Sequence, residues 1–252
     1  MLPRILRLTW PESRARDGWI WNSFWYAALL LMATNSITNC FAHNLHGDAL
    51  AQLAAMVAYY LLLVYLETRS RRVLAAMVLL VPVGFLIKQS LLIWGVWYGG
   101  FLALWGRSWK RLGVFVVATA ALFGATLSVC YAIWGGPFFY WIFYEMSRHP
   151  VSPLRAFQHV LDSWAYFAAG LLGGVVVLRD RKPDGLLGAW LVWLGLIVLE
   201  AYRSGIEWML NHLGPGCLMA GVWFVAGLAS LGKGSSESLK PAQPKAGSGW
   251  AR

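Results

Sequence analysis

The chain has 252 residues, of which 59% are hydrophobic and only 13% are charged, whereas soluble domains carry roughly 25% charged residues. A soluble domain of this size could not cover its surface with so few charges, and its 16 Trp would leave large apolar patches. The three Cys lie far apart and are odd in number, which indicates neither a disulfide framework nor a zinc site. This composition excludes an ordinary soluble enzyme and predicts an all-α polytopic membrane protein.

Apolar segments near the length that crosses a membrane, about 20 residues, recur along the chain. Five are clear candidates: residues 49–66, 112–134, 160–178, 186–200 and 217–231. The stretch 73–105 is too long for one crossing and is interrupted by Lys88-Gln89-Ser90. Because a charge at mid-bilayer costs about 2.5–3.5 kcal/mol on insertion scales, we expect Lys88 at the tip of a hairpin between two short spans. A more polar segment, residues 19–39, brings the expected total to about eight transmembrane helices.

These spans divide the chain into three parts. Residues 1–18 contain four Arg and no apolar signal region, and we expect a cytoplasmic N-terminal segment there. Residues 19–232 form the predicted multi-helix transmembrane domain. Residues 233–252 are rich in Ser, Gly, Pro and Lys, which predicts a disordered cytoplasmic tail.

The basic residues are sorted between the predicted loops. If both termini are cytoplasmic, 17 of the 21 Lys and Arg fall on the inner side, in five groups within residues 4–16, 69–72, 107–111, 179–182 and 233–252. Four remain on the outer side: Lys88, Arg148, Arg155 and Arg203. This bias is typical of helices oriented by basic loops. The net charge of +10 is therefore explained by topology, and we expect no nucleic-acid partner.

The outer side carries the side chains suited to chemistry. All five His fall there, and the two longer outer segments, residues 135–159 and 202–216, are predicted to form short interfacial helices. Pro150 and Pro153 are expected to end the first of these helices. A function that involves chemistry is therefore expected on the outer face.

Cations on the outer side are unusual, and two explanations are open for them. They can bind an anionic ligand such as a lipid phosphate, or they can pair locally. Arg148 has Glu145 at i,i+3, and Arg203 has Glu207 at i,i+4. Lys88 has no acidic neighbour in sequence, which favours a functional role. Arg155 can also extend its side chain toward the interface.

Two further patterns have simple structural interpretations. His43, His46 and Asp48 are residue types that can bind a divalent cation, but Asp48 is also a good N-cap for a helix that starts at Ala49, and we assign no metal site. Gly170 and Gly174 form a small-xxx-small step, which predicts close packing of two helices.

Three short stretches, in this order, resemble the later part of integral-membrane glycosyltransferases of the C-type fold. They are His46-Gly47-Asp48-Ala49-Leu50, Phe85-Leu86-Ile87-Lys88-Gln89-Ser90, and Ser204-Gly205 followed by Asn211-His212-Leu213. The resemblance covers roughly residues 40–230. It implies an enzyme of the polyprenyl-phosphate-sugar-dependent class, similar to bacterial mannosyl- and arabinosyltransferases, in the inner membrane.

The resemblance also implies roles for particular residues. Lys88, Arg148 and Arg203 would bind the donor phosphate and stabilise the charge on the departing lipid phosphate. Four further residues are expected to line the same cavity: Gln89, His149, Asn211 and His212. The other expected partners are membrane lipids.

One feature departs from the family pattern. In the family, a catalytic carboxylate lies in a long first outer loop, sometimes with a divalent cation nearby. The first outer loop of this chain spans only residues 40–48, and Asp48 is its one carboxylate. Asp48 therefore becomes the candidate catalytic residue, or else the chain is the C-terminal half of the fold and a partner subunit supplies the rest. The alternatives are a transporter or flippase for an anionic lipid or solute, and a non-catalytic membrane subunit.

Overall fold

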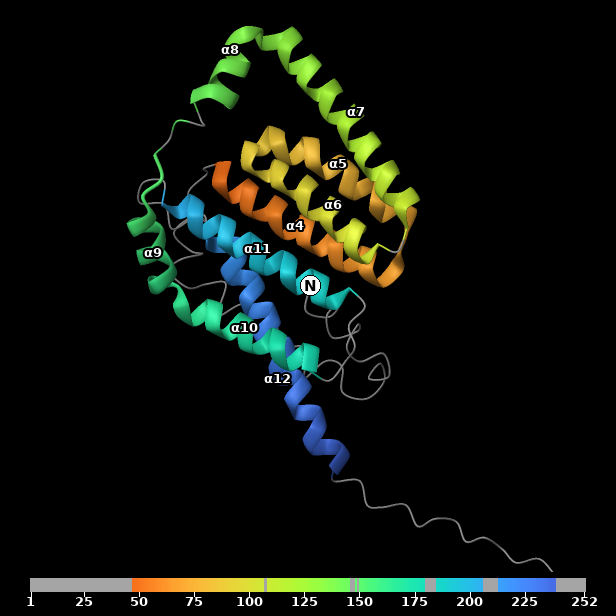
Figure 1. The fold of residues 1–252 in the computed structure, drawn as a ribbon, viewed down its shortest axis with the longest axis vertical. Helices are drawn as coiled ribbons and strands as arrows, with labels where there is room; N and C mark the ends of the chain where they lie inside the picture. The colour runs from red at the N-terminus through yellow and green to blue at the C-terminus, as the bar shows by residue number, and fades with distance from the viewer. Residues whose placement is uncertain are drawn as a thin grey trace, which may run out of the picture.

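The structure, a computed structural model, describes residues 47–106, 108–145, 148, 150–179, 185–205 and 213–238. The regular structure of these residues is entirely helical, as Figure 1 shows, and the expected all-α class is confirmed for them. The predicted segment 1–18, the predicted span 19–39 and the end of the predicted tail lie outside the described residues.

The first half of the described residues contains four helices and one 3-10 turn: α4 (Gly47–Thr68), α5 (Arg71–Ile87), η1 (Gln89–Leu92), α6 (Ile93–Trp105) and α7 (Trp109–Trp134). Two of the connections are fixed by serine caps. Ser70 Oγ accepts a hydrogen bond from Arg72 N at the start of α5, and Ser108 Oγ accepts one from Arg111 N at the start of α7. The predicted interruption at Lys88 is confirmed, because Lys88 has extended backbone between α5 and η1.

The second half contains α8 (Gly136–Phe139), the π-helix η2 (Tyr140–Glu145), α9 (Pro153–Asp162), α10 (Trp164–Arg179), α11 (Leu186–Ser204) and α12 (Gly214–Ser238). The aromatic run of the first long outer segment is therefore helical, as expected. The second expected interfacial helix falls largely on residues 206–212, outside the described part of the chain.

Several described helices can cross a membrane. Leu50–Thr68, Trp109–Trp134 and Leu186–Ser204 are long and apolar enough, and α9 with α10 makes a fourth candidate if the bent pair is one span. Gly214–Leu228 is a shorter apolar helix. The chain thus has several helices able to span a membrane, as an integral membrane protein requires.

Three predicted boundaries need correction. The span expected at residues 160–178 is not one straight helix, because α9 and α10 meet at Ser163 with a bend of 67°. Pro153 starts α9 instead of ending the preceding helix, since its missing N–H and fixed φ suit a first helical turn capped by Ser152. Helix α12 continues to Ser238, past residue 233 where we expect the tail to begin.

The core of the bundle joins α4, α6, α11 and α12 through buried aromatic side chains. Tyr59 OH donates a hydrogen bond to Ala189 O at 2.9 Å and accepts one from Trp223 Nε1 at 2.9 Å. Tyr98 OH donates to Ala58 O at 2.8 Å. These bonds satisfy polar groups that would be costly to bury alone, and they fix the register of the helices around α4.

Helices α10 and α12 pack at very short range, which confirms the prediction for Gly170, whereas Gly174 faces the Trp190 side chain of α11. A Cβ added at Gly170 would lie 2.8 Å from Ala220 Cα, and one at Gly227 would lie 2.6 Å from Gly173 Cα. Side chains at these positions would force the two backbones apart.

Helix α7 is the exception to this compact packing. Only 6% of its apolar window is buried, compared with 56% for α4 and 44% for α11. Figure 1 shows α7 running past the ends of α5 and α6, with α8 at its far end. Its exposed apolar surface suits contact with lipid more than contact with water.

Candidate functional site

A pocket with a cavity volume of about 50 Å³ lies at one end of the bundle. It forms where α4 and α12 begin and where α5 and α11 end, so the ends of four described helices meet there. Such a volume has room for a few water molecules or a small polar group. The side chains that line it are Ala51, Gln52, Ala55, Lys88, Ser90, Leu91, Ile93, Trp94, Leu196, Leu199, Glu200, Arg203 and Pro215.

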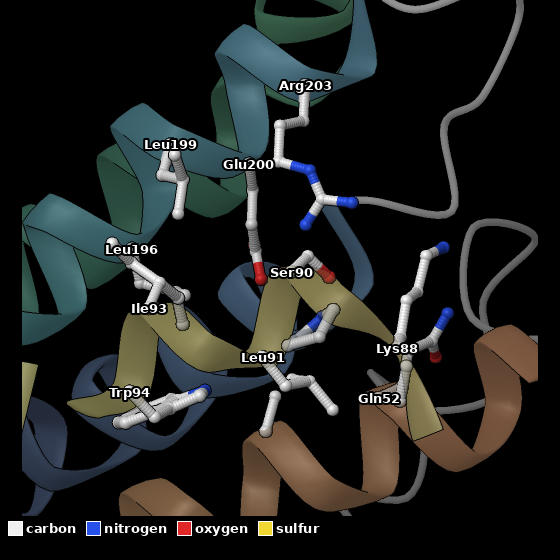
Figure 2. A pocket seen from close by; sticks show the side chains of 13 residues that line it. Gln52, Lys88, Ser90, Leu91, Ile93, Trp94, Leu196, Leu199, Glu200 and Arg203 are labelled. Atoms are coloured by element: carbon white, nitrogen blue, oxygen red, sulfur yellow. The ribbon is translucent and has the colours of Figure 1, made fainter. Parts of the chain in front are cut away.

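Lys88 reaches the pocket because the turn between α5 and η1 is tightly fixed. Lys88 N donates to Gly84 O at 2.8 Å, and Lys88 O accepts from Leu91 N at 2.9 Å. A Cβ at Gly84 would lie 3.1 Å from Leu91 Cβ, so glycine lets the turn fold back against α5. Figure 2 shows the Lys88 side chain extending beside Gln52.

Glu200 is the one carboxylate among the described residues that line the pocket. It is 7% exposed, and its Oε2 accepts a hydrogen bond of 2.9 Å from Gly216 N. Gly216 is held from its other side, because its carbonyl accepts a bond of 3.0 Å from Trp193 Nε1. A Cβ at Gly216 would lie 2.5 Å from Glu200 Oε2, so only glycine leaves room for the carboxylate.

Arg203 follows Glu200 three residues later on α11, on the same side of the helix. Figure 2 shows the Arg203 guanidinium, the Glu200 carboxyl and the Lys88 ammonium on side chains that extend into the same space from two elements. The structure therefore brings together Lys88 and Arg203, two of the three cations predicted to bind phosphate.

The rest of the lining combines two neutral polar groups with an apolar wall. Gln52 and Ser90 supply an amide and a hydroxyl, and a Cβ at Gly214 would lie 3.1–3.2 Å from the Gln52 side-chain amide. Trp94 and Leu196 belong to the apolar wall. An arrangement of two cations, hydrogen-bonding groups and an apolar wall suits an anionic head group attached to an apolar chain.

Arg148, the third predicted phosphate-binding cation, lies outside the pocket. Its Nη1 is 3.9 Å from Glu145 Oε1, and its guanidinium lies 5.0 Å from the centre of the Tyr144 ring. The local pair at i,i+3 that the sequence left open for Arg148 is thus present. Glu145 Oε1 also accepts a hydrogen bond of 2.6 Å from Tyr140 OH, and this bond raises the pKa of Tyr140.

The other predicted residues are not placed at the pocket. Asp48 belongs to the first turn of α4, but its side chain is not among those described. Gln89 lies in η1, next to lining residues on both sides, and does not itself line the pocket. His149, Asn211 and His212 lie outside the described residues, as do His43, His46 and Glu207. Arg155 lies in the first turn of α9.

No metal site is present within the described ranges. There, no group of three or more His, Cys, Asp and Glu side chains is placed to hold a metal ion. The candidate site at His43 and His46 falls outside those ranges.

Three hydrophilic side chains of the pocket lining were not predicted as site residues from the sequence: Gln52, Ser90 and Glu200. The sequence could have identified two of them as candidate site residues. Ser90 directly follows Lys88 and Gln89 in the interrupted apolar segment, and Glu200 is a charged residue at the end of an apolar span. The hydrogen bond between Glu200 and Gly216 joins two helices and has no signature in the sequence.

Basic residues of the loops predicted to be cytoplasmic lie at the end of the bundle opposite the pocket. We call Arg69, Arg71, Arg72, Lys110 and Arg111 the basic end.

Two of these cations are fixed by contacts with other elements. Arg69 Nη1 donates to Trp105 O at 3.2 Å, and its guanidinium lies 5.6 Å from the Tyr65 ring centre. Arg111 Nη1 donates to Tyr65 OH at 3.3 Å. Because Gln52 and Tyr65 are about 20 Å apart along α4, the loops are sorted to opposite ends of the described bundle.

Fold and pocket together define a class: an α-helical protein with apolar helices able to span a membrane and a charged pocket at one end of its bundle. No protein-family model, curated protein or solved structure matches the chain. The function must therefore be argued from the pocket itself.

Proposed function

We propose that this protein is a membrane glycosyltransferase, or the C-terminal half of one, that takes a sugar from a polyprenyl-phosphate donor. The observation that carries the proposal is the meeting of Lys88 and Arg203 at one pocket, although Lys88 lies between α5 and η1 and Arg203 lies on α11, far apart in sequence. Two cations at one small pocket can both donate charge-assisted hydrogen bonds to a phosphate group.

The surroundings of the two cations support a lipid-linked phosphate more than a free anion. The pocket has an apolar wall, and it lies at the ends of α4 and α11, two helices long enough to cross a membrane. A donor whose prenyl chain lies in the bilayer places its phosphate at the level of such helix ends. Gln52 and Ser90 are placed to hydrogen-bond its sugar or phosphate oxygens.

The proposal includes an orientation in the membrane. With about eight spans and both termini in the cytoplasm, the basic end faces the cytoplasm and the pocket faces the outside, as the positive-inside rule requires. A bacterial inner membrane is the setting that this arrangement and the donor chemistry favour. The acceptor would be a hydroxyl group that approaches from the outer face.

Transfer of sugar tests the proposal. The full chain is reconstituted in liposomes with radiolabelled polyprenyl-phosphate mannose or arabinose and a mixture of envelope glycan acceptors, and incorporation of label is measured. We expect wild-type protein to transfer label, and Lys88→Gln to lose transfer while it still inserts into the membrane. Unchanged transfer in Lys88→Gln would contradict the assigned role of the pocket.

The same preparation separates the alternative functions. Movement of the labelled lipid between leaflets without any transfer would identify a flippase. Stable co-purification with a partner subunit, together with indifference to Lys88 replacement, would identify a non-catalytic subunit. Arg71→Gln is the matched control, because it removes a cation from the basic end.

A further inference from the structure

The pocket lining includes a buried donor that forms no hydrogen bond within the described residues. Trp94 lines the pocket and is 2% exposed, and its Nε1 has no hydrogen-bond partner there. A buried polar group without a partner lowers stability, so proteins retain few such groups. The unpartnered N–H of Trp94 therefore needs a physical explanation.

The other large aromatic side chains in the core of the bundle do have partners for their polar atoms. These atoms are the hydroxyls of Tyr59 and Tyr98 and the indole nitrogens of Trp193 and Trp223. Other described residues with buried side-chain atoms that lack a partner, such as Trp97, Thr119 and His159, do not line the pocket. Trp94 is thus the described residue at which an unpartnered buried donor coincides with the pocket.

The Trp94 ring is held in place by two tyrosines. Its centre lies 5.6 Å from that of the Tyr98 ring and 6.5 Å from that of the Tyr59 ring. Both tyrosines donate hydrogen bonds to main-chain carbonyls of neighbouring helices. Figure 2 shows the ring nitrogen of Trp94 on the side turned toward Leu91, another lining residue. The orientation of the donor is therefore fixed before a ligand binds.

The chemistry of this donor limits what it can bind. An indole N–H donates one hydrogen bond and accepts none. Its partner must be an acceptor, and a pocket lined by Lys88 and Arg203 favours the oxygens of an anionic group. The cavity of about 50 Å³ has room for a small polar group, so a phosphate oxygen is the acceptor that fits.

We propose that Trp94 is a binding residue of the pocket, and that its indole N–H donates a hydrogen bond to an oxygen of the lipid phosphate. This inference rests on the function proposed above. Because Nε1 is enclosed by neighbouring side chains, the entering head group forms the bond by displacing part of this cover. A hydrogen bond is directional, so it also orients the head group in the pocket.

Trp97 provides a matched control on the same helix. It follows Trp94 by three residues on α6, and its Nε1 is also buried without a partner in the described residues. Its ring packs against α11, where a Cβ at Gly195 would meet it, and it does not line the pocket. A change at Trp97 therefore removes an indole N–H without a change to the pocket lining.

The experiment removes the N–H and keeps the shape of the ring. Benzothienylalanine, in which sulfur replaces the indole N–H, is incorporated at position 94 or at position 97 of the full chain. Calorimetry measures the affinity of each protein for farnesyl phosphate, a soluble phosphomonoester with a short prenyl chain. Thermal unfolding in detergent measures the stability of each protein without ligand.

We expect the variant at position 94 to bind farnesyl phosphate roughly 10-fold more weakly than wild type, because it loses a hydrogen bond to a charged group. The variant at position 97 should bind within about twofold of wild type. Without ligand, the variant at position 94 should unfold at the same temperature as wild type or above it, because the change removes a donor that has no partner. A lower unfolding temperature would contradict the inference, since the N–H would then have a structural partner.

The outcomes separate this inference from the proposed function. Equal affinity in wild type and in the variant at position 94 would overturn the inference and leave the phosphate site standing. No binding of farnesyl phosphate to wild type would overturn the proposed function itself. Inorganic phosphate should bind more weakly than farnesyl phosphate, because it has no prenyl chain to contact the apolar wall. Equal binding of the two would overturn the assignment to a lipid phosphate.

A second measurement uses only the wild-type protein, in case the variant does not fold. In the nitrogen-15 NMR spectrum of protein labelled at its 16 Trp, one indole N–H signal should move downfield when farnesyl phosphate binds. A spectrum in which no indole N–H signal moves on binding would contradict the inference.

Discussion

The two ends of the bundle both carry cations, but they hold them in different ways. At the basic end, Arg69 and Arg111 donate to a main-chain carbonyl and to a tyrosine hydroxyl, and they tie loops to the end of α4. At the pocket end, Lys88 and Arg203 line a cavity together with a buried carboxylate. The first arrangement stabilises connections between helices, whereas the second leaves a space that a ligand can enter.

This difference explains why a count of basic residues alone does not find a site. In the proposed orientation, cations at the basic end are numerous because basic loops are retained in the cytoplasm. Cations at the pocket end are few, and each of them opposes that same bias. Cations on the side where the positive-inside rule disfavours them are therefore more informative about function than cations on the favoured side.

The largest expected effect comes from removing both pocket cations. A hydrogen bond to a charged group contributes about 1.5–3 kcal/mol, so Lys88→Gln and Arg203→Gln should each weaken farnesyl phosphate binding roughly 10- to 100-fold. The double variant should abolish measurable binding. Calorimetry measures the affinity of each variant for farnesyl phosphate. A double variant that binds farnesyl phosphate within threefold of wild type would show that the pocket is not the phosphate site.

Substitution of Gly216 tests whether the position of the Glu200 carboxyl group matters at the pocket end. In Gly216→Ala, the new Cβ would lie 2.5 Å from Glu200 Oε2, so the carboxylate must move. We expect sugar transfer to fall by roughly 10-fold, a barrier increase of about 1.4 kcal/mol. The matched control is Gly124→Ala on α7, where a Cβ meets nothing within 4 Å. Equal transfer rates in the two variants would show that the position of Glu200 is unimportant.

At the basic end the same kind of change should affect stability instead of binding. Tyr65→Phe removes the hydroxyl that accepts from Arg111 Nη1. The loss of one hydrogen bond should lower the free energy of unfolding by about 0.5–1.5 kcal/mol, measured by thermal unfolding in detergent. Farnesyl phosphate affinity should stay within twofold of wild type, and a larger loss of affinity would mean that the two ends are coupled.

The smallest effect is expected from the exposed cations of the basic end. Arg71 and Arg72 are exposed in the first turn of α5. Replacing both with Gln should change stability by less than about 1 kcal/mol and leave farnesyl phosphate affinity unchanged. A strong loss of farnesyl phosphate affinity in this variant would show that the phosphate binds at the basic end and not at the pocket.

The parts of the structure that follow from local rules could be predicted from the sequence. The break at Lys88 follows from the cost of a charge within an apolar segment, and the Glu145–Arg148 pair follows from helical spacing. The close packing at Gly170 follows from its small-residue step. Each of these needs only a few neighbouring residues.

Other features depend on contacts between distant segments and could not be predicted. The sequence indicated Lys88 and Arg203 separately, but only the packing of α11 against α6 and α4 brings them to one pocket. The bond between Gly216 N and Glu200 joins α12 to α11. Ser163, where α9 and α10 bend, follows Asp162 near the start of a long apolar segment, and a serine there is also tolerated in a straight helix.

Photo-crosslinking can show directly whether a polyprenyl phosphate binds at the pocket that contains Lys88 and Arg203. A polyprenyl phosphate that carries a photoreactive group near its phosphate is incorporated with the full chain into liposomes, irradiated, and the modified residues are identified by mass spectrometry. We expect crosslinks at the pocket end, on residues 88–94 and 196–203. These crosslinks should disappear in Lys88→Gln. Labels confined to the basic end, or a pattern that Lys88→Gln leaves unchanged, would contradict binding at this pocket.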